Sequence, residues 1–355
     1  MRDDSKRARA WAAGIASLSA SMHASSGWTA ETQQRSDSLE AVIVTAERIA
    51  EAPASEPTAQ TKKLLDVPGS FGDPLQSVFA LPGVLPTDEV GGMPAVRGSG
   101  PEDNYFLTDF LPTGYLYHAF GFSIFNENLL RDFGIKTAGF GARYGRATSA
   151  VFDVNLREPR QAPWTRTIDL SFLRVGAMLE GELTDSQAMY VSFRESTLHV
   201  LLKARDEALA EEEDITFERY PRARDLQAKY AWRIDDANRV SLLLVGAYDG
   251  TGVRFGDTAD LSLLDPGAAG SAKFEREFAS EALTWQYDDG TTRWRTAFGH
   301  LGTSQTLRFG ALGEYSNNDS DVWTLRTQYE RTFDAHTIAA GAELQRAVLD
   351  FSTRV

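Results

Sequence analysis

The sequence predicts an N-terminal α+β domain followed by antiparallel transmembrane β-barrel strands, about nine of them, which make an incomplete barrel. Three observations predict this fold class. From Trp164 onward, apolar and polar residues alternate with the period of two that marks half-buried strands. Short turns and long connections alternate along the same part of the chain, as in outer-membrane barrels. Before Trp164, the chain instead carries helix-capping signals and short apolar runs.

The composition limits the function classes. A length of 355 residues is sufficient for two domains with cores of their own. The formal net charge of -14 and the pI near 4.9 argue against a basic nucleic-acid footprint, so no nucleic-acid partner is expected. The absence of cysteine excludes disulfides, thiolate metal sites and cysteine catalysis, and the five histidines lack metal-binding spacing. We therefore expect no metal and no cofactor.

The first residues are typical of an export signal. Lys6, Arg7 and Arg9 form a basic start, and apolar and small residues follow up to Ala24. This order predicts a signal peptide over residues 1–26, and the alternative is a disordered N-terminus rich in Ala and Ser. No run of about 18 apolar residues exists, so no transmembrane helix is expected. The polar composition that follows predicts a flexible linker over residues 27–62.

One β-prone segment interrupts this linker. Residues 39–48 read LEAVIVTAER, in which Val42 to Thr45 favour an extended backbone. A β-prone segment within a flexible tether suits strand addition to the sheet edge of a partner protein. The alternative is an edge strand of the domain that follows.

Residues 63–160 carry the signals of short helices and strands. Asp73 and Pro74 predict the N-cap and first position of a helix that stops at Pro82. A second short helix is expected after Asn126. Short strands are expected at 95–97, 105–108 and 133–136.

Residues 161–355 follow the strand period instead. Leu226, Ala228, Tyr230 and Trp232 alternate with polar residues, and the same pattern recurs along the chain. Strands are predicted at 166–174, 177–183, 187–197, 224–234, 239–248, 279–288, 291–301, 321–332 and 336–347. Short turns are expected at 184–186, 235–238, 288–290 and 333–335, and long loops at about 198–222, 249–278 and 303–320. A soluble β-sandwich, the alternative, usually has short turns at both ends.

The predicted number of strands is too small for a closed barrel that encloses the N-terminal domain. Single-chain bacterial barrels have even strand numbers. About nine or ten strands also enclose a lumen too narrow for a domain of about 100 residues, since plugged transporters have about 22 strands. We therefore expect the chain to be the N-terminal part of a longer protein.

Two stretches resemble one known family. Residues 96–112 read VRGSGPEDNYFLTDFLP, and residues 140–146 read FGARYGR. Both resemble the plug domain of TonB-dependent outer-membrane receptors, with Asp109 at the aspartate of the family's LLDG motif. Phe110 replaces the glycine of that motif, so we expect this turn to differ. The residues that the resemblance marks as structural in the plug are Arg97, Gly98, Asp109, Arg143 and Gly145. The arginines Arg143 and Arg146 are expected to pair with acidic residues of the barrel wall.

The resemblance implies a plug over residues 63–160, a partial barrel over 161–355 and a TonB box within residues 39–48. The implied function is TonB-dependent uptake across the cell outer membrane of a scarce solute of the siderophore, cobalamin or oligosaccharide class. No chemistry on that solute is implied. TonB and the outer-membrane lipid would be the other partners. The residues that would pair with TonB are Ala41, Val42, Ile43, Val44, Thr45 and Ala46.

Plug loops of this family that face the external cavity can contact the solute. The resemblance therefore implies a set of polar and aromatic ligand-binding candidates, namely Glu102, Asp103, Asn104, Tyr115, Tyr117 and His118. The alternative is that these side chains cap loops or pair with arginines of the barrel.

Two other functions compete with uptake. A truncated, non-transporting outer-membrane binding or signalling protein would have the same motifs. An exported all-β glycan hydrolase would need paired carboxylates in a cleft. Nucleotide and calcium sites are disfavoured, because Arg97 to Gly100 lacks the G-K-[ST] ending of a phosphate loop and Glu211 to Asp214 lacks the calcium-loop spacing. We expect no enzymatic activity.

Overall fold

The computed structural model describes residues 73–87, 93–119, 121–137, 139–209, 215–255, 270–310 and 313–354. The predicted signal peptide, linker and TonB-box segment lie outside the described residues. Among the helices of the described ranges, none is both long and apolar enough to cross a membrane.

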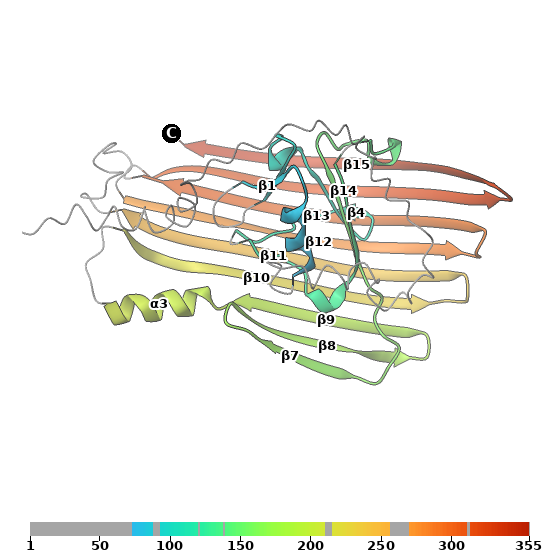
Figure 1. Ribbon diagram of the computed structural model, residues 1–355, viewed down its shortest axis with the longest axis horizontal. Helices are drawn as coiled ribbons and strands as arrows, with labels where there is room; N and C mark the ends of the chain where they lie inside the picture. Colours follow the sequence, from blue (N-terminus) through green and yellow to red (C-terminus); the bar gives the residue numbers. More distant parts are fainter. Residues whose placement is uncertain are drawn as a thin grey trace, which may run out of the picture. The chain divides into compact units, whose positions relative to one another are not determined.

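An antiparallel sheet of nine strands dominates the described residues (Figure 1), in agreement with the predicted strand count. Each strand pairs with its sequence neighbours, in the order β15-β14-β13-β12-β11-β10-β9-β8-β7, so that β7 and β15 are the sheet edges in this part of the chain. The strands are β7 (Thr165–Leu170), β8 (Arg174–Thr184), β9 (Gln187–Ser196), β10 (Ile215–Arg233), β11 (Asn238–Phe255), β12 (Gly270–Asp288), β13 (Thr292–Phe309), β14 (Glu314–Phe333) and β15 (His336–Arg354).

Tight turns join the strands at one end of the sheet, where the sequence predicts them. Aspartate side chains organise two of these turns. The Asp235 carboxylate accepts backbone N–H bonds from Ala237 and Asn238, at 2.9 and 2.7 Å. Asp289 accepts the amides of Thr291 and Thr292 in the same way, at 2.9 and 2.7 Å. These bonds fix the backbone locally, as aspartate does in many turns.

The other end of the sheet corrects the expected loops. The loop predicted at 303–320 is wrong, because β13 continues to Phe309 and β14 begins at Glu314. Strands β11 and β12 likewise extend into the loop expected at 249–278. The loop expected at 198–222 contains helix α3 (Leu198–Leu209) and the start of β10.

The outer face of the sheet, defined as the face away from the N-terminal residues, carries an apolar band. Strand register aligns one apolar row across β11 to β15, formed by Leu242, Leu283, Phe298, Leu325 and Leu344. Each of these side chains is at least 43% exposed. Next to the tight turns, the Trp294 ring lies 5.4 Å from the Trp285 ring and 6.1 Å from the Tyr329 ring. An apolar band with an aromatic border is typical of strands that face lipid.

The N-terminal body, defined here as the described residues between 73 and 160, has a small sheet of its own in the order β4-β3-β6-β5. Its strands are β3 (Tyr105–Thr108), β4 (Leu111–Pro112), β5 (Leu130–Lys136) and β6 (Val151–Leu156), and a separate pair joins β1 (Val84–Pro86) to β2 (Pro94–Val96). Its 3-10 helices are η1 (Pro74–Ala80), η2 (Pro101–Asp103), η3 (Glu127–Leu129) and η4 (Ala142–Tyr144).

The predicted helix caps are present in this body. Asp73 accepts the amide of Leu75 at 3.0 Å and caps η1. Asn126 accepts the amide of Asn128 at 3.0 Å and caps η3. Both helices are 3-10 rather than α, since each is too short to gain from the α-helical ladder.

The N-terminal body packs against the inner face of the nine-stranded sheet, and one hydrophobic core crosses the contact. The Tyr115 ring meets the Phe278 ring edge-on at 4.9 Å between centroids. Gly114 and Gly299 permit this close approach: a Cβ at Gly114 would lie 2.6 Å from Phe278, and one at Gly299 would lie 2.6 Å from Leu111. The shared core means that body and sheet are stabilised together.

Candidate functional site

A strained turn of the body contacts the sheet at Asp109 and Phe110. Both residues adopt positive φ angles, 47° and 86°, which cost energy for residues with a Cβ. The Asp109 carboxylate accepts the amide of Leu156 at 2.8 Å. It also pairs with the Lys229 ammonium at 2.8 Å, and that ammonium lies 3.1 Å from Glu158. A buried lysine from β10 therefore joins two carboxylates of the body.

Two arginines of the sheet hold Phe110. The Arg295 and Arg326 guanidinium groups lie over its ring, at 4.8 and 4.4 Å from the centroid. Arg295 also donates to the Asp109 carbonyl at 2.9 Å, and Arg326 to the Phe110 carbonyl at 2.8 Å. We call Asp109, Phe110, Lys229, Arg295 and Arg326 the turn clamp. It keeps Phe110, where the family motif has glycine, in a left-handed conformation that glycine would adopt without strain.

A second contact surrounds His118, whose ring is buried between two carboxylates of the sheet. Its Nδ1 lies 2.9 Å from Asp249 and its Nε2 lies 3.3 Å from Asp225. Burial alone would lower the pKa of the imidazole, but these carboxylates outweigh burial and raise the pKa of His118 to about 9. The ring is therefore an imidazolium at neutral pH.

Two arginines of the sheet bind the same two aspartates that flank His118. Arg194 bonds Asp225 at 3.0 Å and donates to the Ser123 carbonyl at 2.9 Å. Arg276 bonds Asp249 at 3.0 Å and donates to the Tyr117 carbonyl at 2.8 Å. We call His118, Arg194, Asp225, Asp249 and Arg276 the histidine network. Each sheet aspartate thus has both a body cation and a sheet cation, which compensates for its burial.

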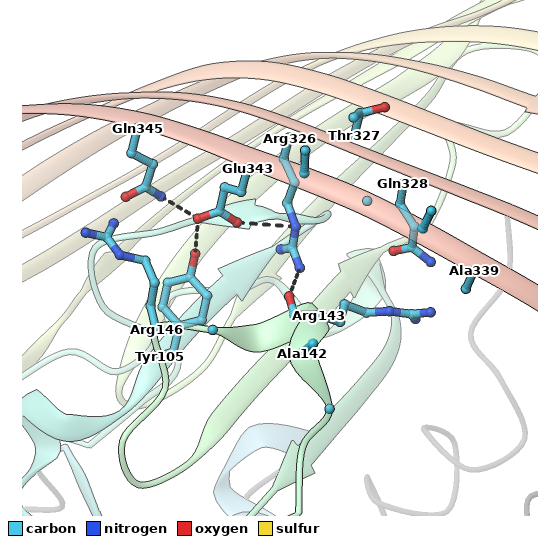
Figure 2. Close-up of a pocket in the computed structure, with 15 residues that line it drawn as sticks. Tyr105, Ala142, Arg143, Arg146, Arg326, Thr327, Gln328, Ala339, Glu343 and Gln345 are labelled. Carbon is cyan, nitrogen blue, oxygen red and sulfur yellow. Dashed lines mark hydrogen bonds and ion pairs between the residues drawn. The ribbon is translucent and has the colours of Figure 1, made fainter.

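A cleft of about 740 Å³ lies between the body and strands β14 and β15 (Figure 2). Within it, the Tyr105 hydroxyl donates to Glu343 at 3.4 Å, and Arg326 donates to the Arg143 carbonyl at 2.9 Å. Burial, followed by the Glu343 charge, raises the pKa of Tyr105 to about 12. Arg143 lies 3.7 Å from Glu330 of β14, an acidic residue of the sheet. Arg146, for which the same kind of pairing is expected, lines the same cleft.

The structure divides the six predicted ligand residues into two groups. Glu102 is exposed, and its neighbours bond within the body: Asp103 accepts from Thr148 at 3.3 Å, and Asn104 donates to the Pro94 carbonyl at 2.7 Å. Tyr115, Tyr117 and His118 are buried instead.

Each buried aromatic residue has a partner of its own. The Tyr117 hydroxyl donates to the Leu75 carbonyl at 2.8 Å, and the Arg276 guanidinium lies 4.1 Å from the Tyr115 ring centroid. A solute would reach these rings only after the segment that carries them moves. Their role as ligand residues stays a prediction.

The predicted plug residues occupy turns. Arg97 and Gly98 have φ angles of 54° and 84° in the turn after β2, where the Arg97 amide donates to the Gly83 carbonyl at 2.7 Å. Gly145 caps η4 with a φ of -65°, a conformation open to any residue. Across the described ranges, no group of histidine and acidic side chains is arranged to hold a metal ion.

Sequence reasoning missed the sheet residues of both contacts. In the sequence, Asp225 and Lys229 are distinguished only as polar residues that alternate with the apolar residues of a predicted strand. Charged residues on one face in the middle of a strand that is apolar on its other face are nonetheless a signal, because buried charges require partners. Their partners in the body could not be read from the same pattern.

No family model matches the sequence, and the curated proteins contain no significant match. Solved structures do match. The siderophore receptor PirA from Pseudomonas aeruginosa superposes with a TM-score of 0.55 at 16% identity, over 82% of this chain and 48% of PirA. A ferric enterobactin receptor mutant from the same organism, in complex with enterobactin, gives 0.54 at 14%, over 78% and 47%. PirA from Acinetobacter baumannii gives 0.51 at 14%, over 72% and 42%.

The chain thus spans less than half of the length of these receptors. In this chain, the described residues comprise a body packed on the inner face of an antiparallel sheet whose strand order is continuous. The described residues therefore have the fold of the TonB-dependent outer-membrane receptors, in the form of a partial barrel with its N-terminal body.

Proposed function

We propose that this chain is the N-terminal part of a TonB-dependent receptor that takes up a scarce solute through the cell outer membrane. The observation that carries the proposal is the position of the N-terminal body. It lies on the inner face of a sheet whose outer face bears an apolar band, and charged side chains rather than covalent bonds hold its turns there. A body held in this manner can block a passage and still be displaced.

The membrane location is supported by the division between the two sheet faces. Apolar side chains that are about half exposed would be unfavourable in water, whereas lipid would cover them at a gain of roughly 25 cal/mol per Å². The aromatic border formed by Trp285, Trp294 and Tyr329 would then lie at the interface next to the tight turns.

The N-terminal body would act as the plug. Its predicted extent, residues 63–160, precedes the first strand of the nine-stranded sheet. The turn clamp and the histidine network would hold it closed, and solute binding would shift the population toward a state in which the TonB box is available. This requires that the solute binds the second state more tightly than the first.

TonB would supply the work of opening. The residues proposed to pair with it, Ala41 to Ala46, fall outside the described residues, and their support is the β-prone sequence. No catalytic step on the solute is part of this function. The proposed solute is a siderophore, a cobalamin or an oligosaccharide. The similar solved structures are of siderophore receptors.

Proline substitution tests the TonB step. Ile43→Pro removes a backbone donor and should abolish capture of the full protein by the periplasmic domain of TonB, because a pairing strand needs its amides. Ala54→Pro, in the predicted linker, is the matched control and should leave capture unchanged. Equal capture of the wild-type and Ile43→Pro proteins would overturn the proposed TonB box.

The mass of the native protein separates uptake from its competitor, a non-transporting binding or signalling protein. The protein would be extracted in detergent from the outer-membrane fraction of its source cells. A mass near twice 39.1 kDa supports a transporter with a complete barrel. A folded membrane species at or below that mass would rule out transport.

A further inference from the structure

The inner face of the sheet changes character above the N-terminal body. We define the neutral wall as the inner-face positions of β13, β14 and β15 between the Arg326 row and the strand ends at Phe309, Glu314 and Arg354. Strand register identifies these positions, because directly paired residues point to the same face. Phe278, which contacts Tyr115 of the body, pairs with Thr303, and Thr303 pairs with Ser320.

The same register extends the wall toward the strand ends. Gln305 pairs with Asn318, and Asn318 pairs with Phe351. The next row joins Leu307, Ser316 and Thr353. Up to Glu314 at the strand end, these described inner positions carry hydroxyl, amide, aliphatic and phenyl groups and no charge.

The outer face at the same height is charged. Glu277 pairs with Ser304, which pairs with Asp319, and Asp319 pairs with Asp350. Lower on the inner face, the turn clamp is charged as well. Beside the wall, Arg276 of the histidine network pairs with Gln305, and its guanidinium bonds Asp249 and the Tyr117 carbonyl. In a chain with 24% charged residues, the described inner positions of β13, β14 and β15 above the Arg326 row therefore form an uncharged surface up to Glu314. A polar barrel lining alone would not exclude charges.

The chemistry of the wall fits one class of ligand. An anionic solute, such as a ferric catecholate, is recognised by lysine and arginine, and these are absent from the wall. Hydroxyl and amide groups exchange hydrogen bonds with neutral hydroxyls, and phenyl rings pack on the C–H faces of sugar rings. The wall groups are close enough to act together, since the Thr303 and Ser320 hydroxyl oxygens lie 2.7 Å apart.

We infer that the receptor takes an uncharged, hydroxyl-rich solute of the neutral oligosaccharide class, which separates it in substrate from the siderophore receptors that it resembles in fold. This inference rests on the proposed uptake function. It assigns Thr303, Gln305, Asn318 and Ser320 to solute hydroxyls and Phe351 to a sugar face.

Binding to the native, detergent-extracted protein tests the inference. The probes are an array of neutral glucan, mannan, xylan and galactan oligosaccharides and, separately, ferric enterobactin. Binding of at least one neutral oligosaccharide without binding of the anionic chelate is the expected result. Binding of ferric enterobactin alone would overturn the inference and leave the uptake function intact. Binding of neither probe would also overturn it, and TonB capture would then report on the uptake function independently.

Two adjacent asparagines provide a matched pair of variants for the oligosaccharide that binds. Asn318 lies on the inner face, and Asn317, which pairs with Thr306, lies on the outer face at the same height. Asn318→Asp should weaken binding about tenfold, because it replaces amide donors with a charge that a neutral solute does not compensate. Asn317→Asp makes the same chemical change and should alter the affinity by less than about twofold. Equal effects of the two substitutions would contradict the assignment of the wall.

Discussion

The turn clamp and the histidine network hold the same body on the same sheet by different physical means. In the turn clamp, sheet cations bond to backbone carbonyls, to a ring and to Asp109, and the held turn is strained. In the histidine network, a titratable body cation lies between two sheet carboxylates. The comparison teaches that the turn clamp holds the Asp109–Phe110 turn against its own backbone strain. The histidine network instead depends on the single proton that makes His118 a cation.

This difference matters because the proposed uptake requires the body to detach. The strain in the Asp109–Phe110 turn, of the order of 1–3 kcal/mol for each unfavourable residue, favours departure once the cations are displaced. The histidine network contributes no comparable strain from described residues, because the positive φ angles outside glycine fall at Arg97, Asp109, Phe110 and Asp334. The turn clamp is therefore the contact expected to accelerate opening after its first bonds break.

The largest effect is expected from Lys229→Met. The substitution leaves the Asp109 and Glu158 carboxylates facing each other without their cation, and removal of one partner from a buried ion pair costs about 3–5 kcal/mol. Hydrogen exchange of the β6 amides in the native protein would measure the lost stability of the body. Lys203→Met, on exposed α3, is the control and should change it by less than about 0.5 kcal/mol. Similar protection in both variants would remove Lys229 from the turn clamp.

The pH dependence of the body is the next largest effect. The folded pKa of His118, about 9, lies above its usual value of 6.5, so its stabilisation is complete below about pH 6.5 and is lost as the pH rises through about 9. The loss is on the order of 3 kcal/mol for a shift of this size. Exchange of the β6 amides should therefore accelerate beyond its intrinsic pH dependence between about pH 6.5 and pH 9, and the extra acceleration should level off above pH 9. His118→Asn should remove this extra acceleration, and its persistence would assign the transition to another group.

Phe110→Ala measures the ring contacts of the turn clamp. The variant keeps the positive φ angle but loses both cation–π contacts, which contribute about 1–2 kcal/mol to body stability, in addition to the cost of truncating a buried ring. Phe79→Ala, a ring contact within the body that involves no sheet cation, is the comparison. If Phe110→Ala changed the salt dependence of body detachment no more than Phe79→Ala, the arginine contacts would contribute nothing specific.

Phe110→Gly isolates the strain, which is the smallest effect. Glycine accepts a φ of 86° without a Cβ penalty, so this variant should be about 1 kcal/mol more stable than Phe110→Ala. Denaturant titration of the two variants, followed through β6 exchange, provides the difference. A Phe110→Gly variant that is less stable than Phe110→Ala would mean that the turn is not strained.

Sequence patterns predicted the strands best where lipid-facing residues alternate with inner ones. Leu226 to Trp232 were assigned to a strand because their outer face is apolar, and β10 contains them. Beyond the apolar band the pattern disappears: in β14, the stretch from Glu314 to Asp321 is polar on both faces, so it resembles a loop. Backbone pairing with β13 and β15 keeps it extended, and such pairing leaves no hydrophobic period in the sequence.

The candidate site was predictable only on the side of the body. The glycine and arginine positions near Asp109 and Arg143 resemble a known motif, and the structure places both beside the sheet. The opposing charges are separated from them by more than a hundred positions, as in the pairing of Lys229 with Asp109. A single sequence does not show which distant charges meet. An ion pair requires two opposite charges, but it sets no particular separation between them along the chain.

In the proposed receptor, the length of the strands would make the rim of the barrel stiff. Strand β14 has 20 residues, which corresponds to roughly 65 Å of extended chain, while the apolar band of a membrane barrel is about 25 Å tall. Even with a tilt of about 40°, much of the strand would stand outside the membrane. A rim built from hydrogen-bonded strands bends little, so the entrance should accept or reject a molecule by fit to a preset shape. An antibody or a phage that approaches from outside would meet this stiff rim before any part of the bilayer.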